Sequence, residues 1–505
     1  MSLAIGVSNK ILSSPRYKWW VFGTVGIGIF VSLVDQTGVN LALPRIADHF
    51  DATIPAVQWL TLGYTLSTGS LLLPMGRLAD IIGRKRVYMS GFVIFTIAAL
   101  LTGSSTSLIA MIMFKILQGV GAAMIQSTGM AILTSTFPSK ERGKAIGLFM
   151  TIVGLGAIAG PVLGGAVVGQ WGWRFLFFLV APFGLASVLV SLVVLEGQFV
   201  ARKAGSVAGR FNFDWMGAVL SAAALAVFLL VMTNAYRVGW GSPVVIVALV
   251  AVLVLIVAFI RWETRVSEPM LAMDLFNNRL FSLGSSAAFL GFLAGPPVFM
   301  LMPFYLQGVL DFSPGRAGLV MAPTALAYAT TGPIAGRLSD KYGWRKFTVA
   351  GLILIAGSLV SLSRLTADSG VMLVIPSLLV QGIGMGAFYS PNTSAVLSTV
   401  DKESYGIATA YLNMVRNVAT VTGIALSITI VTAVMSSRGF EPSLDAVSAT
   451  GGAEGLKAAF TQGLRISYLA MLGSIVVAIA LATLAGRAPA NTSSPEPDRR
   501  QTSKV

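Results

Sequence analysis

Residues 76–86 read GRLADIIGRKR, and residues 336–346 read GRLSDKYGWRK. Both stretches keep a Gly, Arg, Leu, Asp, Gly and basic pattern in register, and each follows an apolar run. A second echo pairs QGVG at 118–121 with QGIG at 381–384, at nearly the same offset along the chain. The sequence therefore predicts two similar halves in a parallel internal repeat.

The apolar runs around these motifs predict an all-α polytopic membrane protein. Hydrophobic residues make up 55% of the 505 residues and charged residues 11%, whereas soluble proteins carry about 25% charged residues. We predict fourteen membrane helices, grouped six, two and six, because each run approaches the roughly 20 residues that cross a bilayer. They are Trp19–Leu43, Val57–Met75, Val87–Gly103, Leu108–Leu133, Ala145–Val168, Phe175–Leu195, Trp215–Ala235, Pro243–Trp262, Phe281–Leu306, Ala317–Ala335, Phe347–Leu365, Val371–Leu397, Ile407–Met435 and Ile466–Ala485.

The charges predict the orientation. Most of the 35 Lys and Arg residues lie in loops on the side of the N-terminus, and short cytoplasmic loops are enriched in Lys and Arg. We therefore expect both termini in the cytoplasm, and we attribute the net charge of +15 to topology rather than to nucleic-acid binding. The chain has no Cys and one His, which excludes disulfide frameworks, thiolate metal sites and His-based catalysis.

This grouping predicts four regions. Residues 1–200 form a first six-helix bundle, residues 201–270 hold two linking membrane helices, and residues 271–486 form a second six-helix bundle. Residues 487–505 are polar and are expected to be a disordered cytoplasmic tail. The Gly, Ser and Ala-rich segment 436–463 is expected to be the one sizeable external loop.

Four motifs carry a resemblance to the major facilitator superfamily, and within it to the fourteen-helix drug/proton antiporter branch. The stretch 76–86 is similar to the superfamily signature between helices 2 and 3, and LVDQTGVNLALP at 33–44 resembles the first-helix motif of that branch. GAIAGPVLGG at 156–165 resembles the fifth-helix motif of exporters. The fourth-helix motif departs from the family in one respect, because the family's arginine is Lys115 here.

Three charged residues fall inside the predicted spans and away from their ends: Asp35, Lys115 and Arg416. Such groups are costly in a membrane and are candidates for function. Asp35 is the only carboxylate among them, so we expect it to load and release the transported proton. The alternative is a fixed ion pair with Lys115 or Arg416, and the two roles are compatible if the pair breaks on protonation. The resemblance implies a part in proton transfer for Lys115, against a purely structural pairing with Asp35.

Polar stripes mark two helices. Lys115, Gln118 and Gln126 share one face of the fourth helix, and the thirteenth helix carries Asn413, Arg416, Asn417 and Thr420 at helical spacing. We expect the first stripe to line a cavity; the second could instead form a hydrogen-bonded seam between helices. Further candidates for the cavity wall are Tyr64, Tyr389, Asn392 and the broken helix at Gly295-Pro296-Pro297.

The glycine and loop motifs suggest roles in packing and closure. Gly156, Gly160 and Gly164 form a small-residue stripe with Pro161 and Gly165 beside it, which permits close helix packing and, by resemblance, favours export over import. In the first basic loop (residues 76–86), which includes Gly76 and Gly83, we expect an ion-pair latch of Asp80 with Arg77, Arg84, Lys85 and Arg86. Asp340 with Arg337, Arg345 and Lys346 is its counterpart in the second basic loop (residues 336–346). The alternative for both loops is that their charges only set topology.

These features together predict a proton-coupled exporter of amphiphilic or hydrophobic small molecules that works by alternating access. With one coupling carboxylate, we expect neutral or monocationic substrates. The alternatives are export of a lipid, siderophore or other metabolite, or import; a sensor or an embedded hydrolase lacks the necessary domain or residues. We expect a monomer in a bacterial cell membrane, with no metal or cofactor, no nucleic-acid partner, and the proton gradient as its energy source.

Overall fold

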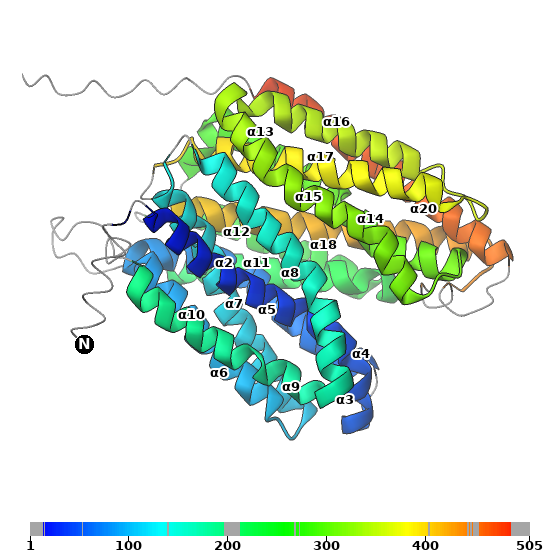
Figure 1. The fold of residues 1–505 in the computed structure, drawn as a ribbon, viewed down its shortest axis with the longest axis horizontal. Coiled ribbons are helices and arrows are strands. Elements are labelled where there is room, and N and C mark those ends of the chain that lie inside the picture. The colour runs from blue at the N-terminus through cyan, green and yellow to red at the C-terminus, as the bar shows by residue number, and fades with distance from the viewer. Residues whose placement is uncertain are drawn as a thin grey trace, which may run out of the picture.

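The computed structural model of the chain is all-helical (Figure 1). It describes residues 14, 16–52, 54–138, 141–195, 213–266, 269–271, 273–401, 404–441, 444, 447 and 454–485. Within these ranges, 11 helical segments are long and apolar enough to cross a membrane. Three further predicted runs coincide with α5, α8 and α15, which have 24, 30 and 29 residues. The expected tail at 487–505 lies outside the described residues.

The first half of the chain, here α2 to α10, follows the predicted pattern with local breaks. Its helices are α2 (Tyr17–Gly38), η1 (Val39–Leu41), α3 (Leu43–Phe50), α4 (Ile54–Val57), α5 (Trp59–Ile82), α6 (Arg84–Gly103), α7 (Leu108–Thr136), α8 (Arg142–Trp171), α9 (Trp173–Phe178) and α10 (Val180–Val194). Gly83 and Gly172 stand between helices with φ of 102° and 88°, a region that L side chains avoid. These glycines allow sharp reversals into α6 and α9.

The inserted pair, α11 (Trp215–Val238) and α12 (Pro243–Glu263), follows the first half. The side chain of Asp214 caps α11 by accepting a hydrogen bond from the Gly217 N–H at 2.9 Å. α11 packs against both α5 and α18, so it contacts both halves. α12 presents most of its apolar surface to the outside, as a helix facing lipid does.

The second half, here α13 to α20, repeats the arrangement. It contains η4 (Met273–Asn277), α13 (Arg279–Ala294), α14 (Pro296–Phe304), η5 (Tyr305–Val309), α15 (Pro314–Tyr342), α16 (Trp344–Leu362), α17 (Val371–Leu397), α18 (Tyr405–Ser437) and α20 (Glu454–Leu484). The predicted break at Gly295-Pro296-Pro297 is confirmed, since α13 ends at Ala294. The expected external loop at 436–463 is wrong at both ends: α18 extends to Ser437, and α20 already begins at Glu454, because EGLKAAF is rich in good helix formers.

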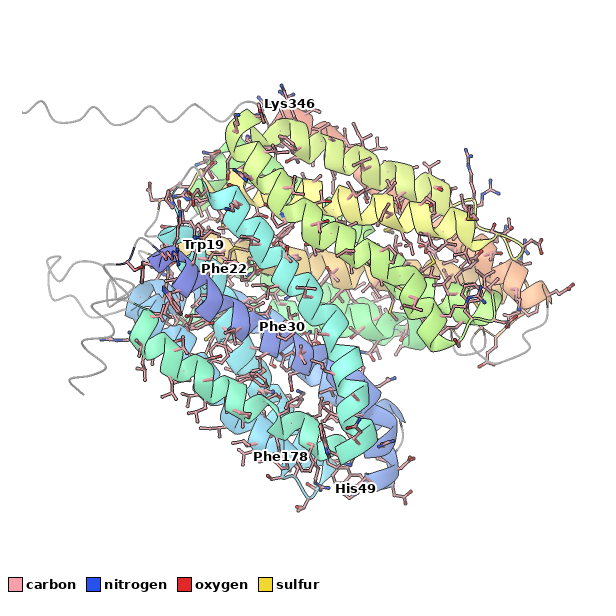
Figure 2. All side chains as sticks on the ribbon, viewed as in Figure 1. Trp19, Phe22, Phe30, His49, Phe178 and Lys346 are labelled. Carbon is pink, nitrogen blue, oxygen red and sulfur yellow. The ribbon has the colours of Figure 1, made fainter. Side chains whose placement is uncertain are left out.

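The two halves meet along α8 with α15 and along α18 with α5 and α7. In Figure 1 they lie together near the start of α2 and diverge toward α3 and α9 on one side and the start of α20 on the other. Figure 2 places Trp19, at the start of α2, and His49, in α3, at opposite ends of the first half. Gly76 and Gly336, the first residues of the two basic loops, lie against backbone or side chains of the opposite half, so the basic loops lie where the halves touch.

Candidate functional site

A buried ion pair lies inside the first half. The Lys115 Nζ in α7 donates to the Asp35 Oδ2 in α2 at 2.7 Å and to the Gln118 Oε1 at 2.7 Å. Each of the two charged residues is 1% exposed, so neither charge is compensated by bulk water. The structure thus brings together Asp35, Lys115 and Gln118, three of the residues predicted from the sequence.

Aromatic rings complete the surroundings of Lys115. Its Nζ lies 5.0 Å from the ring centroid of Tyr64 and 5.2 Å from that of Phe177, within the range of a cation–π attraction. The Tyr64 hydroxyl lies 3.3 Å from the Ser32 Oγ. Tyr64 was predicted as a cavity wall residue and instead contacts the ion pair, while Phe177 was missed because nothing in the sequence relates α9 to α7.

One oxygen of the pair is left over. Asp35 Oδ1 is buried and has no hydrogen-bond partner among the described residues, and the same holds for Gln118 Nε2. An unsatisfied carboxylate oxygen in a buried site is costly. Asp35 therefore keeps one free position at which a proton can bind while its other oxygen still contacts Lys115.

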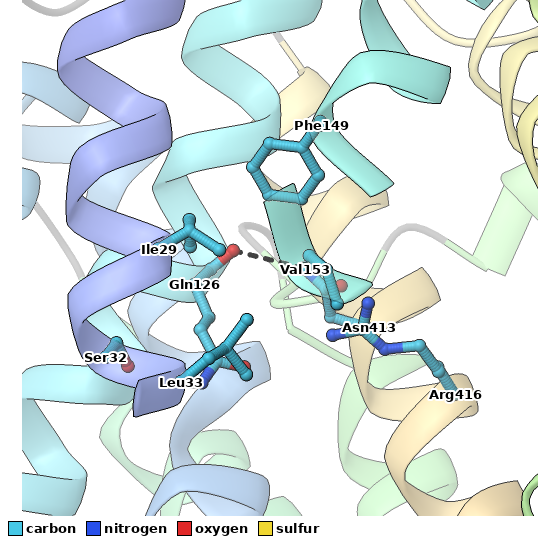
Figure 3. A pocket seen from close by; sticks show the side chains of 8 residues that line it. All are labelled: Ile29, Ser32, Leu33, Gln126, Phe149, Val153, Asn413 and Arg416. Atoms are coloured by element: carbon cyan, nitrogen blue, oxygen red, sulfur yellow. Dashed lines mark hydrogen bonds between the residues drawn. The ribbon is translucent and has the colours of Figure 1, made fainter. Parts of the chain in front are cut away.

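Two cavities lie between the halves, close to this pair along the chain. The smaller, about 20 Å³, is lined by Ile29, Ser32, Leu33, Gln126, Phe149, Val153, Asn413 and Arg416 (Figure 3). The larger, about 220 Å³, is lined by Leu33, Gln36, Thr65, Thr68, Gln126, Met150, Val153, Phe292, Tyr328, Arg416, Asn417 and Thr420. Asp35 is flanked on α2 by residues that line these cavities.

The polar stripes divide between the two roles considered for them. On α7, Gln126 lines both cavities, whereas Lys115 and Gln118 lie in the ion-pair site. On α18, Asn413 Nδ2 donates to the Gln126 backbone oxygen at 3.1 Å, which is a seam between the halves. Arg416 extends from α18 into the smaller cavity (Figure 3) and also lines the larger one.

Two predicted wall residues lie elsewhere. Tyr389 packs edge-on against the Phe292 ring at 4.9 Å, and the Asn392 Nδ2 donates to the Gly284 oxygen at 3.0 Å. Neither lines the two cavities. Several polar or aromatic residues that line the larger cavity were not predicted from the sequence: Gln36, Thr65, Thr68 and Tyr328. Gln36 could have been predicted, because it follows Asp35 directly in the motif at 33–44.

The two basic loops hold the halves together through helix capping. The Asp80 Oδ2 in α5 accepts a hydrogen bond from the Ile407 N–H, at the start of α18, at 2.8 Å. The Asp340 carboxylate in α15 accepts from the N–H groups of Gly143 and Lys144, at the start of α8, at 3.1 and 3.3 Å. Carboxylates at helix N-termini satisfy unpaired N–H groups and face the positive end of the helix dipole.

The charges around Asp80 match only part of the predicted latch. Arg84 forms an ion pair with Asp80 at 3.0 Å, and the Arg77 charge also faces this carboxyl. Burial raises the pKa of Asp80, and Arg84 is the main opposing influence. Arg86 and Arg337 are exposed at the surface. The partners across the halves are thus backbone N–H groups, which the sequence pattern does not display.

Glycines bring helix backbones close at both kinds of contact. A Cβ at Gly76 would overlap Ala410 of α18, and Gly143 and Gly336 lie backbone to backbone between α8 and α15. The predicted stripe in α8 faces α2: side chains at Gly156, Gly160 and Gly164 would meet Leu33, Thr37 and Gly38 respectively. Pro161 and Gly165 lie in the same helix, which continues through both positions. The stripe therefore packs α8 against the helix that carries Asp35.

Hydrogen bonds between the halves are confined to one end in the part of the chain that the structure describes. The bonded pairs are Asp80 with Ile407, Gly143 and Lys144 with Asp340, Ser390 with Gly143, Thr151 with Ala329, and Asn413 with Gln126. They involve α5, α7, α8, α15, α17 and α18, in the portions of these helices toward the basic loops. The structure is closed at that end, with the cavities beyond the closure.

The sequence is similar to that of known proteins over most of its length. The family model described as Major Facilitator Superfamily matches residues 25–424. The riboflavin transporter RibZ of Clostridioides difficile is 33% identical over 410 residues, 81% of this chain and 87% of the relative. The tetracenomycin C resistance and export protein of Streptomyces glaucescens is 30% identical over 407 residues, 80% of this chain and 74% of the relative.

One further relative matches over a similar length, and a solved structure shares the fold. The multidrug transporter protein MdtP of Bacillus subtilis is 29% identical over 413 residues, 82% of this chain and 74% of the relative. The crystal structure of the human organic anion transporter MFSD10 superposes with a TM-score of 0.64 at 15% identity, covering 93% of this chain and 100% of that one, which shows a shared fold. The chain belongs to the major facilitator superfamily and is a multi-pass membrane transporter, not an enzyme.

Proposed function

We propose that this protein is a proton-driven exporter of amphiphilic small molecules in the fourteen-helix drug/proton antiporter branch. The observation that carries the proposal is the buried Asp35 carboxylate, which pairs with Lys115 through one oxygen and has no partner for the other among the residues that the structure describes. It lies on the helix whose Ser32, Leu33 and Gln36 line the cavities. A proton bound at Asp35 weakens the pair with Lys115, and substrate in the cavity lies close enough along α2 to respond.

The topology belongs to the same proposal. Fourteen membrane helices with both termini in the cytoplasm divide into bundles at 1–200 and 271–486, with two inserted helices in 201–270 and a tail at 487–505. The three long helices α5, α8 and α15 supplement the 11 apolar segments. With the basic loops in the cytoplasm, the closed end of the structure faces the cytoplasm, and Asp80 and Asp340 stabilise this outward-facing state.

The transport cycle then has a definite order. A proton from outside reaches Asp35, the substrate leaves, and the caps at Asp80 and Asp340 separate so that the opposite side opens. Asp35 releases its proton to the cytoplasm and re-forms the pair with Lys115 as new substrate binds. Rocking of one half against the other about a fixed site is the general mechanism for this repeat.

The experiment uses purified protein in proteoliposomes with an imposed pH gradient. A panel of neutral, cationic and anionic amphiphiles is tested for substrate-induced proton movement, with Asp35→Asn alongside and Asp48→Asn, on the exposed surface of α3, as the matched control. We expect proton movement in the parent and the control and none in Asp35→Asn. Equal coupling in Asp35→Asn would remove Asp35 from the mechanism.

A second candidate is export of an endogenous metabolite. The relative at 33% identity is named a riboflavin transporter, so flavins belong in the same panel. Proton movement with riboflavin and with none of the drugs would favour this candidate. Substrate accumulation in the direction of the proton gradient would favour import instead.

A further inference from the structure

The larger cavity has one charged wall residue. Of the twelve described residues that line it, eleven are uncharged and the twelfth is Arg416. The uncharged wall combines amide and hydroxyl groups with apolar side chains such as Met150, Val153 and Phe292. Such a cavity suits an amphiphile with an apolar body, and its electrostatic preference is decided by Arg416.

Arg416 has no acidic partner in the part of the chain that the structure describes. Among the described residues, no hydrogen bond or ion pair is found for its guanidinium group, whereas Lys115 is paired with Asp35. Asp35 is the only carboxylate inside the predicted spans, and its charge is already matched by Lys115. No carboxylate within the spans is then left to pair with Arg416. The interior therefore carries one net positive charge, located at the cavity wall, and an uncompensated arginine in a membrane is costly.

We propose that Arg416 binds an acidic group of the substrate, and that the cargo is an organic anion with a carboxylate on an apolar or aromatic body. This inference rests on the proposed transport function and narrows its substrate class. A guanidinium offers two parallel N–H donors that match the two oxygens of a carboxylate. Asn417 and Thr420 lie on the same helix and line the same cavity, so they are placed to hydrogen-bond polar groups near the acid.

The expectation of neutral or monocationic cargo counted carboxylates alone. It omitted Arg416, because the sequence left open whether this residue paired with Asp35. The structure shows Lys115 in that place, which leaves Arg416 for the substrate. The preferred charge of the cargo is thereby reversed.

The charge of the cargo sets the electrical behaviour of the cycle. With one proton moving inward through Asp35, export of a monoanion carries two positive charges inward per cycle. Export of a neutral compound carries one, and export of a monocation carries none. An inside-negative potential therefore accelerates export of the anion most strongly.

The test uses three probes on one naphthalene body, ending in a carboxylate, a primary amide or a trimethylammonium group. Binding to the purified protein is measured by ligand-induced thermal stabilisation, and proton movement is measured in proteoliposomes. The variants are Arg416→Gln and Arg416→Lys, with Arg438→Gln as control because Arg438 is exposed at the end of α18. Arg416→Lys keeps the charge but loses the paired donors.

We expect the parent and the control to bind the carboxylate at least tenfold more tightly than the amide and the ammonium probe. Loss of a charge-assisted hydrogen bond corresponds to roughly ten- to hundredfold weaker binding. Arg416→Gln should therefore weaken binding of the carboxylate probe by that factor and leave binding of the amide probe unchanged. Arg416→Lys should fall between. An inside-negative potential should increase carboxylate-driven proton uptake in the parent.

Three results would overturn the inference: preference of the parent for the ammonium or amide probe, an equal loss for all three probes in Arg416→Gln, or no change for the carboxylate. If Arg416→Gln does not fold, the ranking in the parent and the effect of Arg416→Lys still decide. Selective, Arg416-dependent binding of the carboxylate without any proton movement would support the anion site while rejecting the proposed proton coupling.

Discussion

The Asp35–Lys115 pair allows a test that separates structural pairing from proton coupling. The Lys115 Nζ and the Asp35 Oδ2 are 2.7 Å apart, and both side chains are buried. At an effective dielectric constant of about 20 their attraction is roughly 6 kcal/mol, much of which offsets the cost of desolvation. Removing one partner of a buried pair costs about 3–5 kcal/mol, because the other charge is left without compensation.

The perturbation is a double-mutant cycle of Asp35→Asn, Lys115→Met and both together. Each single variant should melt well below the parent in detergent micelles, and the double variant should recover most of the loss because no unpaired charge remains. Proton coupling should behave differently. It should be absent from the double variant, since no group remains to carry the proton.

The assay combines the melting midpoint, followed by tryptophan fluorescence, with proton movement in proteoliposomes. A double variant that is less stable than either single variant would refute the argument that the two charges compensate one another. A stable double variant that still moves protons with substrate would refute the coupling role of Asp35. In that case the fixed ion pair would be the correct interpretation.

The remaining predictions concern closure and packing. Asp340 lies beyond the end of its predicted span, and burial raises the pKa of its carboxyl to about 6. The hydrogen bonds from the Gly143 and Lys144 N–H groups partly oppose this rise in pKa, and the nearby Glu141 charge adds to it. Asp340 binds a proton more tightly in the closed structure than when the halves separate and its carboxyl is solvated. Closure at the basic loops should therefore strengthen as the pH falls through 6 and weaken as the pH rises. The chain has no native cysteine, so two cysteines can be introduced and spin-labelled, one in each half, at the ends far from the basic loops. Closure at the basic loops moves these far ends apart, so the distance between the labels should be greater at pH 5.5 than at pH 7.5. A pH-dependent difference that survives in Asp340→Asn would contradict this prediction. Gly164→Ala places its Cβ 2.8 Å from a backbone atom of α2, so it should lower the melting midpoint and slow transport, whereas Gly169→Ala, with open space around it, should not; equal effects would show that close approach is not the reason for the glycine. Gly143→Ala should shift the same spin-label distances toward the opposite access state, because a Cβ there meets α15 backbone, and unchanged distances would count against closure through these glycines.

Much of the candidate site could be predicted because membrane burial makes charged residues conspicuous. Asp35, Lys115 and Arg416 are identifiable as single letters within apolar runs, and the structure places all three at the ion pair or the cavities. The pairing itself was open, since a helix face gives direction but no neighbour. Tyr389 and Asn392 show the opposite case: polar groups on a membrane helix were expected at the cavity and instead bond or pack within their own half.

The sequence alone predicts most of the helices and the two related halves, because apolar length and breaks at Gly and Pro are local properties, while the grouping of the spans into six, two and six stays a prediction. It also identified the basic loops, but it did not show that Asp80 and Asp340 cap helices of the opposite half, since backbone N–H groups are the same in every sequence. The folded structure is needed to show that Lys115, and not Arg416, pairs with Asp35, and that Arg416 lines the cavity. That choice depends on distances between helices far apart in the chain, and it decides the charge of the substrate we propose.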